Sequence, residues 1–286
     1  MMDVVIVPCY ERPEYTFLCL VYLSRARGIA DKEVWLCQDQ HKDGPIVVPF
    51  MTEVLAQAEE YIPHIKYRLH ETHNTYGNSK NLIDSLKDAF DTGAERVFLV
   101  EDDIIVAPDI FEWHEAVLDE VGVFVSCATG LNKSAHFQIN GPQAMDEGYH
   151  DPSAYLKVCG PYSSHAAAFK REKLGFLLGY IEGQSSVPWA PGHEQDLVTQ
   201  KYLRTTKWES AWPYAPRAYN VGWRSYHINT GSTFNGALQQ KVRALENTIR
   251  DPQKLKEMSA NNSAVTPLPE KWPVRLEPVR NVQRFR

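Results

Sequence analysis

The sequence lacks the features that mark several large classes of protein. Its longest apolar runs, such as residues 17–23, are far shorter than the roughly 20 residues that a membrane-spanning helix needs. Its five cysteines form no Cys-x-x-Cys pair and are odd in number, which favours reduced, buried thiols over a zinc site or a disulfide framework. There is no internal repeat, no low-complexity tract and no evident linker between independent domains. These absences favour an ordinary globular chain.

The beginning of the sequence also lacks a signal-peptide pattern. It has neither a basic start nor a cleavage site and enters an apolar run at once, so we expect a cytoplasmic protein. With 286 residues, 43% hydrophobic and 23% charged, the chain is long enough for one large domain or two small ones.

The net charge of −6 hides an uneven distribution. Residues 200–286 hold 15 Lys and Arg against 6 Asp and Glu, a net charge of +9, which leaves −15 for residues 1–199. A basic C-terminal third suggests a polyanionic partner such as nucleic acid or an anionic membrane surface. The alternative is that it neutralises the acidic part within the fold.

The strongest local signal is an acidic cluster that follows a buried strand. Four apolar β-formers at 97–100 predict the strand, and Glu101, Asp102 and Asp103 follow at once. Carboxylates in this place are costly unless a cation meets them. A divalent metal that carries a diphosphate would do so, because hard cations take oxygen ligands and bridge to phosphates. An acidic surface turn is the plainer interpretation.

Apolar runs alternate with helical patterns along the first 110 residues. The runs are continuous, which is typical of parallel strands buried on both faces. The sequence therefore predicts an α/β fold with a mostly parallel sheet flanked by helices. The predicted strands are residues 3–8, 33–39, 65–69, 97–100, 121–128 and one within 214–227. The predicted helices are residues 14–26, 52–61, one ending at Ala89, one beginning at 108–109, 171–180, 193–204 and 239–250.

In such a sheet, ligands bind beyond the carboxyl ends of the strands. Several polar residues directly follow predicted strands, and we expect them to converge on one crevice although they lie far apart in the sequence. They are Tyr10, Arg12, Asp39, Asp102 and Asp103.

The motifs around these positions resemble a known family in their order. In chain order they are Pro8-Cys9-Tyr10-Glu11-Arg12-Pro13, Gln38-Asp39, Asn74-x-x-Gly77-x-x-Lys80-Asn81, Glu101-Asp102-Asp103-x-x-x-Ala107-Pro108-Asp109 and Gly192-His193-Glu194-Gln195-Asp196-Leu197. This order resembles the nucleotide-sugar-dependent glycosyltransferases of the GT-A fold, including the family 2-like inverting enzymes and, most of all, the N-acetylglucosaminyltransferase I type. The resemblance covers about residues 3–235.

The resemblance implies a GT-A (Rossmann-like) domain at residues 1–235. Its nucleotide-binding half would be residues 1–110 and its acceptor and catalytic half residues 111–235. Residues 236–286 would form a C-terminal helix and a basic, proline-containing tail on the acceptor side.

The resemblance also implies roles for residues around a UDP-sugar. Each has a plainer alternative, such as a strand-ending turn, a helix cap or a solvated helix face. Pro8, Tyr10 and Arg12 would line the nucleotide pocket, Asp39 would hydrogen-bond the base, Gly77 would let the backbone approach the ligand, Lys80 would contact the base or diphosphate, and Glu101 and Asp102 would hold ribose or sugar hydroxyls.

For the reaction itself, Asp103 would ligate Mn²⁺ or Mg²⁺, with His227 as a second ligand. Transfer with inversion needs a base for the acceptor hydroxyl and a Lewis acid for the departing diphosphate. Glu194 and Asp196 are the candidate bases, with Glu194 favoured, although acidic residues also suit a helix start. Some aromatic residues are candidates either for a sugar-stacking platform or for the core: Trp189, Trp212, Tyr214 and Trp223.

The resemblance does not identify the acceptor. N-acetylglucosaminyltransferase I is a secretory membrane protein, whereas this sequence shows no anchor, so we expect a bacterial or phage-encoded enzyme. The basic C-terminal third makes a hydroxymethylated base in DNA one candidate acceptor, beside a cytoplasmic glycan, a lipid-linked sugar or a protein side chain.

Two other functions stay open at this point. One is a nucleotidyltransferase on a similar sheet, although the loop after the first strand lacks the expected glycines. The other is a non-catalytic nucleic-acid-binding or glycan-binding protein.

Overall fold

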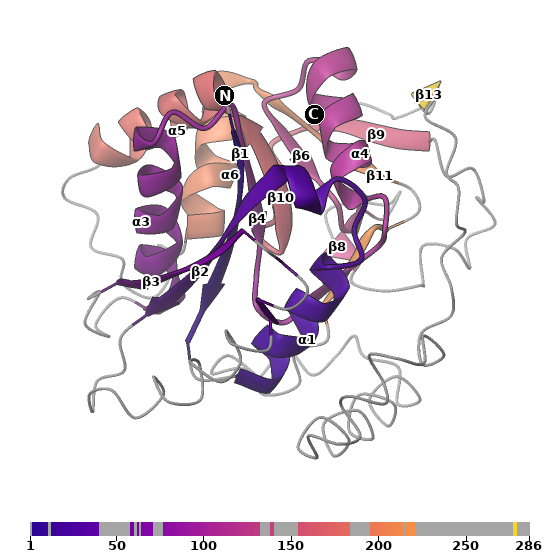
Figure 1. Ribbon diagram of the computed structural model, residues 1–286. Helices are drawn as coiled ribbons and strands as arrows, with labels where there is room; N and C mark the ends of the chain where they lie inside the picture. Colours follow the sequence, from indigo (N-terminus) through magenta and orange to yellow (C-terminus); the bar gives the residue numbers. More distant parts are fainter. Residues whose placement is uncertain are drawn as a thin grey trace.

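The described part of the chain is built around one nine-stranded sheet with helices on both faces (Figure 1). Along the sheet the strands are β13 (Glu277–Pro278), β9 (Ala154–Cys159), β11 (Glu209–Pro213), β6 (Val125–Cys127), β10 (Ala166–Lys170), β4 (Arg96–Val100), β1 (Asp3–Cys9), β2 (Lys32–Asp39) and β3 (Ile65–His70). This computed structural model describes residues 2–10, 13–39, 58–59, 62, 64–70, 77–131, 138–139, 154–183, 195–213, 216–220 and 277–278.

The half of the sheet formed by β3, β2, β1 and β4 is entirely parallel. In β2, every residue is buried, as the continuous apolar run predicted. The parallel direction places the carboxyl ends of all four strands at the same edge of the sheet.

The other half of the sheet is mixed. β10 runs antiparallel to both β4 and β6, whereas β11 pairs parallel with β6 and antiparallel with β9. Because β10 is reversed, its first residue, Ala166, pairs with the last residue of β4, Val100. The segment that precedes β10 therefore reaches the same edge as the carboxyl end of β4.

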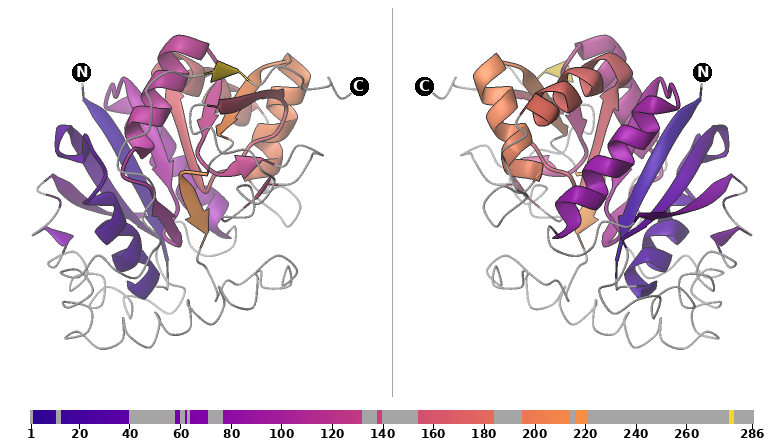
Figure 2. Two further views of the ribbon diagram at one scale, coloured as in Figure 1. Left: turned by 90° about the vertical axis from the view of Figure 1, so that its right-hand side faces the viewer. Right: turned by 90° about the vertical axis from the view of Figure 1, so that its left-hand side faces the viewer.

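Alternate residues of each central strand enter two separate cores. Val5 and Val7 of β1 pack in the core under α1 (Pro13–Leu23) and α4 (Ile110–Ala116). Val4 and Ile6 pack in the core under α3 (Gly77–Asp91), α5 (Arg171–Gly183) and α6 (Gln195–Thr206). The two views of Figure 2 show these helices on opposite sides of the sheet. The predicted coverage of both faces is confirmed.

Two details of the sequence prediction are wrong, and β9, β10 and β11 were not predicted. The strand predicted at 121–128 shortens to β6, because a π-helical turn, η3 (Val117–Val121), precedes it and ends at Gly122, whose φ of 71° suits glycine. β1 continues one residue beyond Pro8, which pairs with β2 where the β4 pairing has already ended, so its missing N–H is tolerated. β11 had no prediction, because only two of its five residues, Ala211 and Trp212, are apolar apart from its proline.

The described residues also form several smaller elements. They are the 3₁₀ turn η1 (Ile29–Asp31) and two antiparallel strand pairs, β5 (Ile104–Val106) with β12 (Ala218–Asn220) and β7 (Gly130–Leu131) with β8 (Gln138–Ile139). Most of the predicted helix 52–61 and all of the helix 239–250 lie outside the described residues. The predicted domain boundary at 235 stays a prediction. In the part of the chain that the structure describes, no helix is long and apolar enough to cross a membrane.

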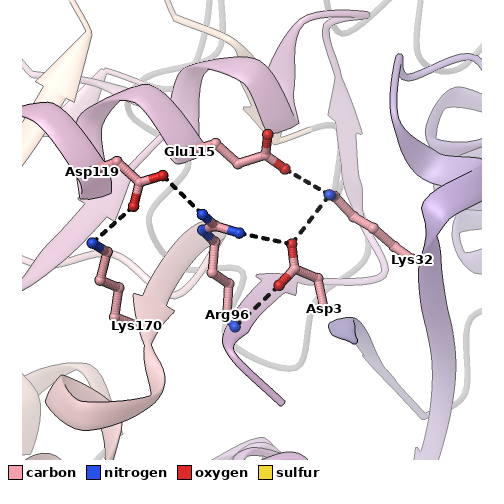
Figure 3. Close-up of polar contacts among 6 residues, drawn as sticks. All are labelled: Asp3, Lys32, Arg96, Glu115, Asp119 and Lys170. Atoms are coloured by element: carbon pink, nitrogen blue, oxygen red, sulfur yellow. Dashed lines mark hydrogen bonds and ion pairs between the residues drawn. The ribbon is translucent and has the colours of Figure 1, made fainter. Parts of the chain in front are cut away.

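A network of charged side chains closes the amino-terminal edge of the sheet, opposite the carboxyl ends of β1, β2 and β4. Figure 3 shows its members, three acids and three bases: Asp3, Lys32, Arg96, Glu115, Asp119 and Lys170. Lys32 is only 5% exposed, and its Nζ lies 2.6 Å from Glu115 and 3.4 Å from Asp3. Arg96 joins Asp3 to Asp119, which also contacts Lys170. We call this set the amino-edge network.

Candidate active site

The three predicted carboxylates lie in the turn between β4 and β5. The N–H of Ile104 donates to the carbonyl of Glu101 at 3.0 Å, which closes the turn. Asp102 and Asp103 are buried, with 3% and 5% of their surface exposed. The N–H of Glu101 donates to the carbonyl of His165 at 3.1 Å, so the β4–β10 pairing continues into the turn. The acidic cluster is a buried part of the sheet edge, and the alternative of a surface turn is wrong.

Neighbouring carboxylates in this turn face different sides of the sheet. Burial, and then the charges of Asp102 and Asp103, raise the pKa of Cys19 well above its ordinary value, so Asp102 and Asp103 lie near α1. Glu101 instead lies beside Ser164 and Asp196, on the α6 side. Burial raises the pKa of Glu101, His165 lowers it, and the nearby negative charges raise it further.

Asp39 and Asp102 lie on either side of the end of β1. Asp39, 5% exposed, ends β2, and the charges of both acids, after burial, contribute to raising the pKa of the Cys9 thiol. Because β2 and β4 flank β1, their ends are separated by two strand spacings, about 10 Å. The Gln38 side-chain amide donates to the carbonyls of Tyr10 and Asp39, both at 2.7 Å, and so holds two strand ends together. The structure therefore brings these predicted residues to one edge.

The first turn of α3 contacts the first turn of α6. Gly77 begins α3, and the hydroxyl of Ser79 accepts a hydrogen bond from the N–H of Gln195 at 3.0 Å. Lys80 forms an ion pair with Asp84 one turn further along α3. Two helices that start at the same edge are thus joined at their amino ends, where backbone N–H groups and dipoles favour anions.

Asn81, the last residue of the predicted glycine-containing motif, holds α3 to the sheet. It is fully buried, its amide nitrogen donates to the carbonyl of Cys37 at 3.0 Å, and its oxygen lies 2.7 Å from His70 Nδ1. This residue connects α3 to β2 and β3 and keeps the start of α3 at the carboxyl edge.

Ser164 joins the carboxylate turn to α6. Its hydroxyl donates to Glu101 Oε1, and its N–H donates to Asp196 Oδ1 at 3.1 Å. The Gln195 side-chain amide donates to the Tyr162 hydroxyl at 3.0 Å, which fastens the same segment to α6. Two acids that are 95 positions apart in the sequence therefore lie on either side of one serine.

Sequence reasoning missed the residues that make this connection. Tyr162, Ser164 and His165 precede β10, and they reach the site only because β10 is antiparallel to β4. The run of three alanines after Ser-Ser-His at 163–165 does not indicate a strand, because alanine favours helices, and β10 was not predicted. No local pattern could have placed this segment at the carboxyl edge.

Some of the predicted site residues lie outside the described part of the chain, and one belongs to the core. Arg12, Glu194 and His227 lie outside the described residues. Trp212 is 1% exposed, and its indole nitrogen donates to Ser210 Oγ at 2.7 Å, so it belongs to the core. As a stacking platform for an acceptor, Trp212 is therefore a wrong prediction.

Comparison with known proteins bears on the fold. No protein-family model matches the sequence, and no curated protein matches it significantly. The crystal structure of S. aureus TarS 1–349 in complex with UDP-GlcNAc is similar, with a TM-score of 0.51 and 17% identity, over 86% of this chain and 66% of that one. A second TarS crystal structure is similar with a TM-score of 0.50 and 17% identity, over 88% of this chain but only 40% of that one. The fold is GT-A.

This likeness confirms the predicted α/β, Rossmann-like fold class. It supports a glycosyltransferase fold in general, but it does not support the predicted resemblance to the N-acetylglucosaminyltransferase I type in particular. In both comparisons the chain covers less than two thirds of TarS.

Proposed function

We propose that this chain is a glycosyltransferase that moves a sugar from a UDP-sugar to an acceptor hydroxyl with inversion. The observation that carries the proposal is the buried carboxylate turn at the end of β4, which is joined through Ser164 to the acid at the start of α6. The GT-A fold and the likeness to a TarS complex with UDP-GlcNAc support it. The donor sugar is a hexose or an N-acetylhexosamine.

The nucleotide would bind across the carboxyl ends of β1, β2 and β4. This placement accounts for a buried acid at the end of β2 and two buried acids after β4, about 10 Å apart. The residues assigned to the donor are Pro8, Tyr10, Arg12, Asp39, Gly77, Lys80, Glu101 and Asp102. Lys80 would have to exchange its ion pair with Asp84 for the diphosphate, which a half-exposed, flexible lysine can do.

A divalent cation fits the donor chemistry at Asp103. Within the described residues, no three His, Cys, Asp or Glu side chains are grouped so as to hold a metal ion by themselves. Mg²⁺ and Mn²⁺ prefer oxygen ligands, and Mg²⁺ in particular often takes one or two carboxylates together with substrate phosphates. Asp103 would therefore hold the ion jointly with the diphosphate, with His227 as a further candidate ligand. When bound, the ion would neutralise charge that develops on the departing UDP.

The acids at the start of α6 would activate the acceptor. Asp196 would take the proton from the acceptor hydroxyl while the oxygen of that hydroxyl bonds to the anomeric carbon of the donor sugar. The bond from the anomeric carbon to the phosphate oxygen would break, and its electron pair would leave on UDP. The hydrogen bond from Ser164 N–H orients one oxygen of Asp196 at the start of α6. Glu194, two residues earlier, is the other candidate base.

The proposed acceptor is a hydroxymethylated base in DNA or a glycan. The net charge of +9 in residues 200–286 favours a polyanion such as DNA. We place the enzyme in the cytoplasm of a bacterium or a phage-infected cell.

Replacement of Asp103 tests the reaction class. We expect Asp103→Asn, or removal of divalent metal with a chelator, to lower UDP release from a UDP-sugar by about 100-fold or more, because several kcal/mol of transition-state stabilisation is lost. Asp91→Asn, an exposed aspartate at the end of α3, is the matched control and should keep full activity. Undiminished UDP release in Asp103→Asn would reject the proposal.

The acceptor is tested with a panel. UDP release from several UDP-sugars is measured with Mn²⁺ present, first alone, then with DNA that contains hydroxymethylcytosine, and then with glycans. Stimulation by one acceptor identifies its class. Release of inorganic diphosphate from a nucleoside triphosphate would instead indicate a nucleotidyltransferase.

A further inference from the structure

Ser164 occupies the position between the proposed donor and acceptor sides of the site. It is 5% exposed, and it precedes β10 at the point where that strand meets the end of β4. Its two hydrogen bonds go to carboxylates of two different elements, Glu101 after β4 and Asp196 in α6. The inference drawn from this arrangement rests on the proposed function.

Two acids held so close together need donors between them. Glu101 and Asp196 repel each other, because both are hydrogen-bonded to the same residue, Ser164, and therefore lie close together. A hydroxyl and an N–H that donate to carboxylates offset part of that repulsion, because hydrogen bonds to charged groups are stronger than neutral ones. Removing the hydroxyl would leave Glu101 without this contact, while the backbone bond to Asp196 would have to hold alone.

The same segment is fastened to α6 at two further points. The Gln195 side-chain amide donates to the hydroxyl of Tyr162, and that of Gln200 donates to the carbonyl of Tyr162 at 3.3 Å. Gln195 also bonds Thr199 Oγ1 at 3.0 Å, which stiffens the first turn of the helix. A displacement of Ser164 therefore transmits to the first turn of α6, where the proposed base lies.

We infer that Ser164 is a positioning residue that sets the separation of Glu101 and Asp196. Through its hydroxyl it orients the carboxylate assigned to the donor sugar, and through its N–H it orients the carboxylate assigned to the acceptor. A sugar bound by Glu101 is thereby presented to the hydroxyl that Asp196 activates. Such alignment matters chiefly in the transition state.

The kinetic test is Ser164→Ala. We expect kcat to fall about ten-fold or more, the value of one hydrogen bond to a charged group, while the KM for the UDP-sugar and the affinity for UDP stay unchanged. The matched control is Ser126→Ala, which also removes a buried hydroxyl, one that lies 2.9 Å from His114 Nδ1. It should leave kcat as in the wild type.

A second measurement does not depend on turnover. Amide hydrogen exchange over residues 195–200 should be faster in Ser164→Ala and in Glu101→Ala than in the wild type. The double variant should exchange at the same rate as the single variants, and Ser126→Ala at the rate of the wild type. Unchanged exchange in Ser164→Ala would overturn the inference whatever the kinetics, and so would full activity of an active enzyme that carries Ser164→Ala. If the wild type releases no UDP from any donor, the proposed function fails, and exchange alone then decides whether Ser164 positions α6.

Discussion

At the scale of single residues, one strongly displaced titration belongs to a histidine outside the candidate site. His114 is 1% exposed, and its Nδ1 lies 2.9 Å from the hydroxyl of Ser126. Burial, followed by the positive charges of Arg217 and Lys32, lowers the pKa of His114 from 6.5 to about 3. The imidazole is therefore neutral in the folded protein at every pH at which a typical enzyme works.

This histidine should make the fold sensitive to acid. Between about pH 6.5 and about pH 3 the unfolded chain binds a proton at residue 114 that the folded chain does not, so stability falls as the pH falls. From about pH 7.5 to about pH 5 we expect the wild type to lose about 2 kcal/mol more than His114→Gln does. Urea unfolding of both proteins at the two pH values measures the difference. Parallel losses in the two proteins would contradict it.

At the scale of elements, the connection between β9 and β10 carries the site residues and depends on Gly160. Its φ of 105° is one that residues with a side chain rarely adopt, and an added Cβ would lie 2.5 Å from Arg204 Cγ. The glycine thus allows α6 to pack closely over the turn that leads to Tyr162 and Ser164.

Substitution of Gly122 and of Gly160 by alanine distinguishes backbone strain alone from backbone strain combined with a steric clash. Gly122→Ala meets no atom within 4 Å, and its φ of 71° should cost about 1 kcal/mol. Gly160→Ala adds the contact with Arg204 and a less favourable φ, so we expect a loss of about 2–3 kcal/mol together with a lower kcat. Thermal or urea unfolding of both variants compares them. Equal losses would mean that Arg204 moves aside without cost.

The elements also show what a sequence can predict. The β4 strand, the acidic turn and the start of α6 were predictable, because apolar runs and acidic helix starts are local patterns. The role of Ser164 was not, because it depends on the reversed direction of β10. Asn81 was noticed as part of a motif, but its hydrogen bonds join β2, β3 and α3, which no local pattern relates.

At the scale of the whole molecule, the two edges of the sheet have different tasks. The carboxyl edge collects the buried acids to which we assign the donor and the metal, whereas the amino-edge network pairs three acids with three bases (Figure 3). Lys32 is the most buried member of that network and also lies 5.0 Å from the ring centroid of Phe98. Stability and ligand binding should therefore respond to different substitutions.

Lys32→Met should destabilise the protein without affecting the proposed donor site. We expect a loss of about 2–3 kcal/mol, because Glu115 and Asp3 lose a partly buried cation, with unchanged affinity for UDP. Arg27→Met breaks the exposed pair with Glu112 and should cost less than about 1 kcal/mol. Urea unfolding and calorimetric titration with UDP measure both quantities. A large change in UDP affinity in Lys32→Met would show that the two edges are coupled.

The side-to-side alternation of β4 has a consequence for how this chain can vary. Val97 and Leu99 enter one core and Phe98 and Val100 the other, and the alternation continues with Glu101 beside Ser164 and Asp102 near Cys19 of α1. A single residue gained or lost in β4 would turn Glu101 toward α1 and Asp102 toward α6, so the two acids would trade neighbours while the composition hardly changed. Insertions in β4 should therefore be tolerated only when they add an even number of residues. The surrounding loops have no such alternation, so this restriction does not apply to them.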